Sequence, residues 1–201
     1  LRSDYSRKNP DAVVSAFLQA FPNDADVRLV IKTNGNPDSV SMNSRMKILV
    51  ESIRRDKRFI LITDTLPYEK VLSIYNACDV FISLHRAEGL GLGPMEAMLL
   101  GKLVIATGYS GNMAYMTEQN SMPIPYRLIE PLQVSWQYKR AFAGSTASWA
   151  EVDIEQAALA LSVARSNPEL RKSLAARGAR EIREKQAAAW GGNYLPQLIQ
   201  Y

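Results

Sequence analysis

The feature that most constrains the fold is a glycine-rich turn between two apolar runs, residues 80–84 and 103–106. Three glycines at alternate positions lie between the runs: Gly89, Gly91 and Gly93. Pro94 then opens an apolar segment of helical period, which ends before Gly101. Because this order reads strand, turn, helix, strand, it predicts a βαβ crossover whose turn lies at the carboxyl end of a strand.

The residue types of this turn predict an anion site. Glycines let the backbone bend without Cβ clashes, and Pro94 at the first helical position gives up an N–H that would be unpaired there. The helix N-terminus adds about half a positive charge, which favours phosphate and should keep Glu96, in the first turn, ionised. Glu88 and Glu96 bracket the loop with seven residues between them. Since carboxylates repel phosphate but bind hydroxyls, we expect a nucleotide-sugar, with hydroxyls on both sides of its diphosphate.

Plainer interpretations exist for each residue. Glu88 alone could be a solvated loop acid, and Glu96 alone a helix-capping acid. The dinucleotide fingerprint G-x-G-x-x-G fails, because its third glycine would fall on Pro94. His85 is the sole histidine, so a histidine metal cluster is excluded, and no G-x-S-x-G elbow supports a catalytic triad. We interpret His85 as a residue that shapes the loop.

Apolar patterns along the rest of the chain alternate between strand and helix. Strands are expected at residues 26–33 and 59–63, with a short edge strand at 122–126. Helices are expected at residues 10–21, 41–55, 67–78, 154–166 and 168–188. This alternation predicts an α/β fold, a Rossmann-like doubly wound parallel sheet, in one domain over residues 1–201 that binds ligands at the carboxyl ends of its strands. Residues 127–148 lack a period and are expected to form a surface excursion.

A second candidate phosphate contact precedes the first helix. Ser6, Arg7 and Lys8 would lie at its N-terminus, where cations and amides can hold phosphate together, although both cations could also be ordinary loop charges. A parallel sheet of this type should have its first strand just before this loop. We therefore expect that strand, and a further domain, to lie outside residues 1–201.

The charge balance is mildly basic, with a net charge of +4 and a pI near 9.2. Basic residues gather in residues 45–58 and 165–185, a pattern typical of solvated helix faces and compatible with an anionic membrane surface. Nucleic acid is not an expected partner, because no aromatic residues interleave with these charges. The single cysteine, Cys78, cannot form an intrachain disulfide, which favours a reducing compartment such as the cytoplasm.

The segments SLHRAEGLGLGPMEAM and GKLVIATGYSGN, together with the spacing of the two acids, resemble the retaining glycosyltransferases of family 4 (glycosyl transferases group 1). These enzymes have the GT-B fold, and the likeness, over residues 3–183, is to the C-terminal donor-binding domain of bacterial members that build surface polysaccharides. The resemblance implies that Glu88 contacts hydroxyls of the donor sugar and that Glu96 holds the ribose. Loop residues implied to meet the sugar and phosphates are Gly89, Leu90, Gly91 and Leu92.

The resemblance also implies roles outside the turn. The segment RKNP matches the loop whose lysine, here Lys8, neutralises the departing diphosphate. The family's arginine five residues earlier is Ser3 here, so Arg7 or Arg2 would replace it. The loop of Thr65 is implied to lie near the nucleotide base, with a plain connecting turn as the alternative. Ser110, Gly111 and Asn112 are implied to contact the donor or its phosphates.

The function that follows is that of the donor domain of a retaining glycosyltransferase acting on a glycan or lipid-linked acceptor. Its donor substrate would be a nucleoside diphosphate sugar, with no metal or other cofactor, because cations and helix amides would stabilise the leaving group. An N-terminal acceptor domain is the expected partner, so residues 1–201 alone should bind donor but turn over poorly or not at all. We expect a cytoplasmic location, at the inner face of the membrane if the basic stretches bind lipid. Two alternatives remain: a non-catalytic nucleotide-sugar-binding or docking module, and a nucleotide-sugar 2-epimerase of the same architecture.

Overall fold

The computed structural model describes residues 5–33, 50–51, 53–131 and 148–190. The secondary-structure elements follow in chain order: α1 (Tyr5–Lys8), α2 (Pro10–Ala20), β1 (Leu29–Lys32), β2 (Phe59–Ile62), α4 (Tyr68–Ala77), β3 (Val80–Ser83), α5 (Leu92–Leu99), β4 (Leu103–Thr107), the 3₁₀ turn η1 (Gly111–Ala114), β5 (Met122–Ile124), β6 (Tyr126–Ile129), β7 (Trp149–Val152), α7 (Ile154–Ser166) and α8 (Pro168–Trp190). Most of the helix expected at residues 41–55 lies outside the described residues. Within it, residues 50–51 and 53–55 are helical.

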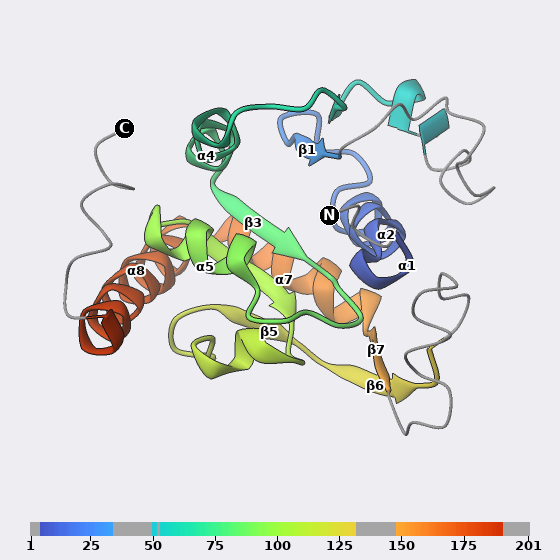
Figure 1. Ribbon diagram of the computed structural model, residues 1–201. Coiled ribbons are helices and arrows are strands. Elements are labelled where there is room, and N and C mark those ends of the chain that lie inside the picture. Colours follow the sequence, from blue (N-terminus) through green and yellow to red (C-terminus); the bar gives the residue numbers. More distant parts are fainter. Residues whose placement is uncertain (1–4, 34–49, 52, 132–147, 191–201) are drawn as a thin grey trace.

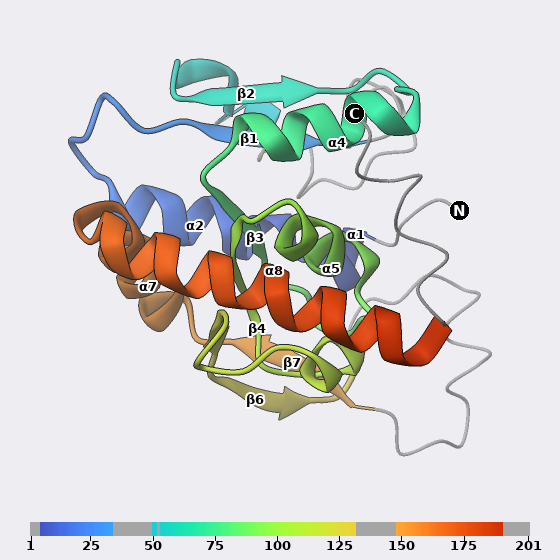
Figure 2. The same cartoon turned by 90° about the vertical axis from the view of Figure 1, so that its left-hand side faces the viewer.

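The described strands form two parallel sheets and one antiparallel pair. β1 pairs with β2, and β3, β4 and β5 pair in that order, all in parallel. β6 and β7 pair antiparallel. Figure 2 shows β1 and β2 on one side of β3 and β4 on the other, with α2 and α7 stacked nearby. The arrangement confirms the expected α/β class with parallel strands.

β4 divides the hydrophobic core into two layers, because its side chains alternate between the faces of the sheet. Leu103 and Ile105 belong to one cluster, which includes α2, α7 and residues of β1 and β3. Val104 and Ala106 belong to the other, which includes α5 and Ile182 of α8. All five residues of β4 are buried, so helices cover both faces of this strand. In Figure 1, α5 lies in front of the neighbouring strand β3 and α7 behind it.

Several expected elements differ in detail. Residues 5–8 form the helical turn α1 where a polar loop was expected, and Asn9 adopts a left-handed conformation, φ 52°, before Pro10 begins α2. β1 and β2 are shorter than expected. Residues 126–129, partly within the expected surface excursion, form β6 because β7 supplies a partner strand. The rest of that excursion, residues 132–147, lies outside the described residues.

The helices at the end of the described chain begin where the sequence predicts. The Asp153 carboxylate accepts from the Gln156 N–H at 3.1 Å and caps α7. Pro168 opens α8, where its missing N–H does no harm. Two local signals, an acid and a proline, thus fix both helix starts.

Candidate functional site

The candidate site lies where β3 and β4 end. These strands run in parallel, with Ser83 opposite Ala106, so the loops that follow them leave the sheet at the same edge. The first loop leads through Glu88 to α5, and the second leads through Ser110 to η1. Ligands of parallel α/β sheets bind at this edge.

Arg7 and Lys8 reach this edge from the other end of the described chain. The Lys8 ammonium forms an ion pair and hydrogen bond with Glu88 Oε2. Arg7 NH1 lies 3.3 Å from the same oxygen and donates to the Ala87 carbonyl at 2.6 Å. The structure therefore brings together the three residues that the sequence suggested for catalysis, although Lys8 is 80 positions from Glu88 along the chain.

Charge compensation controls the ionisation of Glu88. Burial raises the pKa of this carboxyl, but the hydrogen bond and charge of Lys8, with the charge of Arg7, outweigh burial and leave the pKa below its ordinary value. The Glu88 side chain is 14% exposed and that of Arg7 17%. Glu88 and Arg7 are therefore sheltered enough from solvent for their charges to interact strongly.

Arg86 fastens three segments beside this pair. Its guanidinium binds the Glu151 carboxylate in β7 through Nε at 2.8 Å and NH2 at 3.1 Å, and its NH1 donates to the Ser6 carbonyl at 2.6 Å. Its backbone N–H donates to the Arg7 carbonyl at 2.8 Å, and its own carbonyl accepts from the Ala150 N–H at 2.9 Å. Such two-bond arginine contacts fix geometry as well as charge, so Arg86 sets how α1 approaches Glu88.

His85 is fully buried and joins the two loops. Its Nε2 lies 3.1 Å from the Tyr109 carbonyl and 3.2 Å from Asn112 Oδ1, and its Nδ1 lies 3.1 Å from Ser83 Oγ. Because both oxygens near Nε2 are acceptors, Nε2 carries the proton and Nδ1 accepts from the serine hydroxyl. Burial lowers the pKa of His85, so the ring is neutral. This is the loop-shaping role that we expected.

Gly91 and Gly111 are the glycines that the loop geometry requires. Gly91 has φ +76°, and its carbonyl accepts a 2.6 Å hydrogen bond from the buried Tyr115 hydroxyl. A Cβ on Gly111 would overlap the Gly89 carbonyl, so the second loop packs directly against the first. Ser110, just before Gly111, has φ +80°, which is rare for a residue with a side chain.

The geometry of α5 corrects two expectations. The helix begins at Leu92, with Gly91 as its N-cap, so Pro94 is the third helical residue and Glu96 lies beyond the first turn. Burial raises the pKa of Glu96, although the hydrogen bond from Tyr68 opposes that shift. The helix N-terminus therefore does not hold Glu96 strongly ionised, because the macrodipole acts mainly within the first turn.

Glu96 receives a contact that the sequence did not suggest. The Tyr68 hydroxyl, from the first residue of α4, donates to Glu96 Oε1 at 2.7 Å. Thr65 is exposed in the loop three residues earlier, which brings the segment expected near the base to the Glu96 side of the site. Leu90 and Leu92 are exposed at 48% and 63%, so their side chains do not anchor the loop.

Sequence reasoning missed the residues that support the site from outside the glycine-rich turn. These are Tyr68, Tyr115, Arg86 and Glu151. A tyrosine at the start of a helix or an acid in a strand carries no periodic signal, and each partner lies 24 to 65 positions away. The position of Arg86 near Glu88 was evident from the sequence, but its ion pair with Glu151 of β7 could not be predicted.

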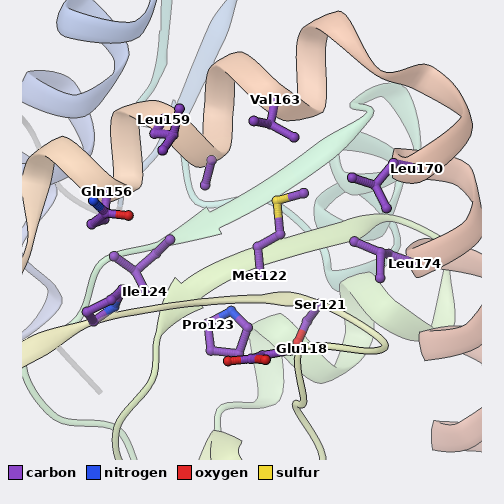
Figure 3. A pocket seen from close by; sticks show the side chains of 12 residues that line it. Glu118, Ser121, Met122, Pro123, Ile124, Gln156, Leu159, Val163, Leu170 and Leu174 are labelled. Carbon is purple, nitrogen blue, oxygen red and sulfur yellow. The ribbon is translucent and has the colours of Figure 1, made fainter.

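An apolar hollow of about 380 Å³ lies between α7, the start of α8 and β5 and shares no residue with the site above. Leu159, Val163 and Leu174 form one side, and Met122 and Pro123 the other (Figure 3). Its lining holds no cation and few polar groups. We take the charged site at the ends of β3 and β4, and not this apolar hollow, as the candidate functional site, because ligand sites combine shape with a few convergent polar groups.

Basic residues of α8 have acidic partners among the described residues. The ion pairs are Arg171–Asp79, Lys172–Glu169, Arg177–Glu181 and Arg180–Glu184. Within the described part of the chain, no helix combines the length and apolarity needed to cross a bilayer. The same residues contain no cluster of three or more His, Cys, Asp or Glu side chains able to hold a metal ion.

Solved structures resemble this fold over most of its length. The C-terminal domain of a glycosyl transferase group 1 family protein, LpcC, from Francisella tularensis matches with a TM-score of 0.66 and 20% identity, covering 89% of this chain and 80% of that one. The pneumococcal O-GlcNAc transferase GtfA, solved with UDP and GlcNAc, matches with a TM-score of 0.62 and 18% identity over 97% of this chain and 34% of that one. Anabaena HepE, solved with UDP and glucose, matches with a TM-score of 0.64 and 15% identity, over 89% and 41%.

These likenesses establish the fold as that of the carboxyl-terminal half of GT-B glycosyltransferases. The chain spans less than half the length of GtfA and HepE. No curated protein matches the chain in sequence. A family model does match, the one described as glycosyl transferases group 1, over residues 3–122. Since this match covers more than half of the 201 residues, the chain belongs to the glycosyl transferases group 1 family.

Proposed function

We propose that this domain binds a nucleoside diphosphate sugar and serves as the donor half of a retaining glycosyltransferase. The observation that carries the proposal is the convergence of Lys8 and Arg7 on Glu88 beside the glycine-rich loop. Two cations and a carboxylate at one edge of a parallel sheet fit a ligand with a diphosphate and hydroxyl groups. UDP in the structures of GtfA and HepE supports the same ligand class.

Each part of the site has a proposed role. Glu88 accepts hydrogen bonds from hydroxyls of the donor sugar, and Glu96 accepts from the ribose. Backbone amides of residues 89–92 meet the sugar and the phosphates, with Ser110 and Gly111 beside them and Thr65 toward the base. Lys8 and Arg7 face the diphosphate. Arg7 is favoured over Arg2 as the second cation because its guanidinium lies 3.3 Å from Glu88, whereas Arg2 lies outside the described residues.

The chemical step that these residues assist is departure of the diphosphate. As the bond from the anomeric carbon to the phosphate oxygen breaks, negative charge grows on the leaving group. Positioned cations and helix amides stabilise such charge without reorganising, and removing one donor of this kind typically costs on the order of 100- to 1,000-fold in rate. In this proposal they supply the positive charge that a metal ion would otherwise supply.

A second domain and one further strand belong to the same proposal. Among the described strands, β1 pairs only with β2, and β3 has no partner other than β4. Ile31 of β1 and Ile82 of β3 nevertheless pack on one hydrophobic cluster. A parallel strand between β1 and β3 would join the two sheets into one. An N-terminal domain would then supply the acceptor site, so that the domain described here binds donor but turns over little by itself.

The proposal extends to the class of acceptor and to the pathway. We propose a glycan or lipid-linked glycan acceptor in bacterial surface polysaccharide synthesis, since the site offers hydroxyl chemistry on the donor side. A cytoplasmic location, at the inner face of the membrane, is part of this proposal. The structure matches several basic residues of α8 with acids, so we assign no membrane contact to that helix.

Nucleotide binding tests the proposal directly. We expect UDP, GDP or ADP, or one of their sugars, to raise the melting temperature of the chain, because a ligand bound only by the folded state stabilises it. Lys8→Ala should weaken binding of the nucleoside diphosphate at least 10-fold. Lys102→Ala is the matched control, because Lys102 is half-buried like Lys8 but bonds a carbonyl, that of Asn76 at 2.7 Å.

The outcomes separate the proposal from its alternatives. Equal binding by the Lys8→Ala and Lys102→Ala variants would contradict the role of Lys8. A chain that binds no nucleotide would favour an interaction module instead. For the intact parent protein, interconversion of the donor sugar without acceptor would favour a 2-epimerase.

A further inference from the structure

Tyr68 occupies a place in the site that neither the sequence motifs nor the roles proposed above assign. It is the first residue of α4, it is 46% exposed, and its hydroxyl donates to Glu96 Oε1 at 2.7 Å. We propose that Tyr68 is the specificity-determining residue for the nucleoside: its hydroxyl orients Glu96 toward the ribose, and its ring forms the stacking surface for the base. This inference rests on the proposed function, because it assumes that Glu96 holds the ribose.

Packing does not account for Tyr68. No residue of α4 is fully buried, and nearly half of the Tyr68 side chain meets solvent. Tyr75, two turns further along α4, is instead partly buried and packs edge-on against Phe81 at 5.1 Å between ring centroids. Burial raises the pKa of Tyr75 to about 12, and the charge of Glu96 adds to that shift. Of these two tyrosines of α4, Tyr75 is therefore held by packing, and Tyr68 is exposed and bonds Glu96.

The hydrogen bond from Tyr68 orients the Glu96 carboxylate and leaves it further acceptor positions. An ionised carboxylate has about four acceptor positions on its two oxygens, and Tyr68 takes one of them, on Oε1. Oε2 and the second position on Oε1 remain for two neighbouring hydroxyls of a ribose. Burial and the Glu96 charge raise the pKa of Tyr68, so its hydroxyl stays a donor throughout the physiological range.

The exposed ring then faces the part of the ligand that carries the base. A base is attached to the same five-membered ring as the hydroxyls, so binding of the ribose by Glu96 places the base within reach of the residue that bonds Glu96. Stacking of a base on an aromatic side chain changes affinity by roughly 5- to 140-fold. Leu90 and Leu92 are exposed on the glycine-rich loop and are aliphatic, so they offer no comparable surface.

The test separates the hydroxyl from the ring with two variants of the 201-residue chain, Tyr68→Phe and Tyr68→Leu. The probes are whichever of UDP, GDP and ADP binds most tightly, its 2′,3′-dideoxy form and inorganic pyrophosphate, measured by calorimetry. Tyr68→Phe should weaken binding of the nucleoside diphosphate about 3- to 10-fold. Its affinity for the dideoxy form and for pyrophosphate should stay within twofold of that of the parent chain. Tyr68→Leu should weaken binding of the nucleoside diphosphate and of the dideoxy form, but not binding of pyrophosphate.

The pH dependence supplies a readout that a purely structural role would not change. Glu96 accepts from two hydroxyls only when ionised, so binding of the ribose should fall as the pH falls through the pKa of Glu96. Tyr68 lowers that pKa, so in Tyr68→Phe the fall should occur at higher pH than in the parent chain. The dideoxy probe should show no such displacement.

Tyr126→Phe is the matched control, because Tyr126 is 39% exposed and lies in β6, outside the site. It should bind all three probes as the parent does. Circular dichroism and melting temperatures verify that each variant is folded. Binding by Tyr68→Phe and Tyr68→Leu that equals the parent at every pH would overturn the inference while leaving the proposed function standing. A parent chain that binds none of the three nucleoside diphosphates would overturn both.

Discussion

Replacement of Gly91 by alanine tests whether the glycine-rich loop before α5 depends on the left-handed backbone conformation of this residue. Gly91 has φ +76°, and a Cβ placed on it would lie 2.8 Å from the Tyr115 hydroxyl and 3.2 Å from Asn112 Cβ. The left-handed conformation costs a residue with a Cβ about 1–2 kcal/mol. Displacing the Tyr115 hydroxyl breaks its buried 2.6 Å hydrogen bond to the Gly91 carbonyl, which costs about 1–2 kcal/mol more.

Together these effects should lower the free energy of unfolding by about 2–4 kcal/mol. Two other glycines isolate the contributions. Gly101 has φ +69° with nothing within 4 Å of its Cβ position, so Gly101→Ala should show the conformational cost alone. Gly89 has a φ outside the left-handed region and also has open space, so Gly89→Ala should change stability by less than about 0.5 kcal/mol.

Urea denaturation followed by circular dichroism measures each difference, and melting temperature gives a second scale. A loss of 1 kcal/mol in a domain of this size lowers the melting temperature by about 2–4 °C. Tyr115→Phe completes a double-mutant cycle: it removes the hydroxyl that the new methyl group would meet, so it should cost less in the Gly91→Ala background than in the parent. Gly91→Ala as stable as Gly101→Ala, or strict additivity with Tyr115→Phe, would refute the reasoning.

Three further predictions concern charge and protonation. The folded-state pKa of Glu88 is lowered, so its ion pair with Lys8 should stabilise the fold above about pH 4.5, and this stabilisation should be lost at more acid pH. Urea midpoints measured across pH should therefore fall less on acidification in Glu88→Gln than in the parent chain. The pKa of His85 is also lowered, so the fold should lose stability as the pH falls below about 6.5, a slope that His85→Gln should remove. Arg86→Lys keeps the charge but loses the two-bond contact with Glu151 of β7 and the bond from NH1 to the Ser6 carbonyl of α1. It should lower the free energy of unfolding by about 1–2 kcal/mol in urea titrations, whereas an unchanged value would show that these contacts do not hold α1 and β7 in place.

Local sequence signals were sufficient for most of the fold. The start of α7 at Ile154 and of α8 at Pro168 follow from a capping acid and a proline, both of which act within one helical turn. β4 follows from its apolar run, since a strand buried on both faces needs no polar alternation. β6 was missed because its exposed residues make sense only with β7 beside them, across a connection of 19 residues.

The site divides in the same way. Sequence spacing placed Glu88 and Glu96 on either side of one loop at the edge of the sheet, and the family resemblance implied that Lys8 joins them. It placed Glu96 in the first turn of its helix because Pro94 usually occupies the first position, but Gly91 caps α5 and the helix starts two residues earlier. Tyr68 and Glu151 could not be found, since their contacts depend on how separate elements pack.

The ion pair between Lys8 and Glu88 has a consequence for selectivity. A ligand that recruits the lysine takes the nearer of two counter-ions from a largely buried carboxylate and leaves it only Arg7, whose NH1 lies 3.3 Å away. Free phosphate could engage the ammonium, but it would weaken the charge compensation of the acid and bring a second negative charge close to it. A molecule that brings an anion for the lysine and hydroxyls for the acid replaces both contacts at once, so the site should bind a nucleotide-sugar more tightly than free phosphate without a steric barrier.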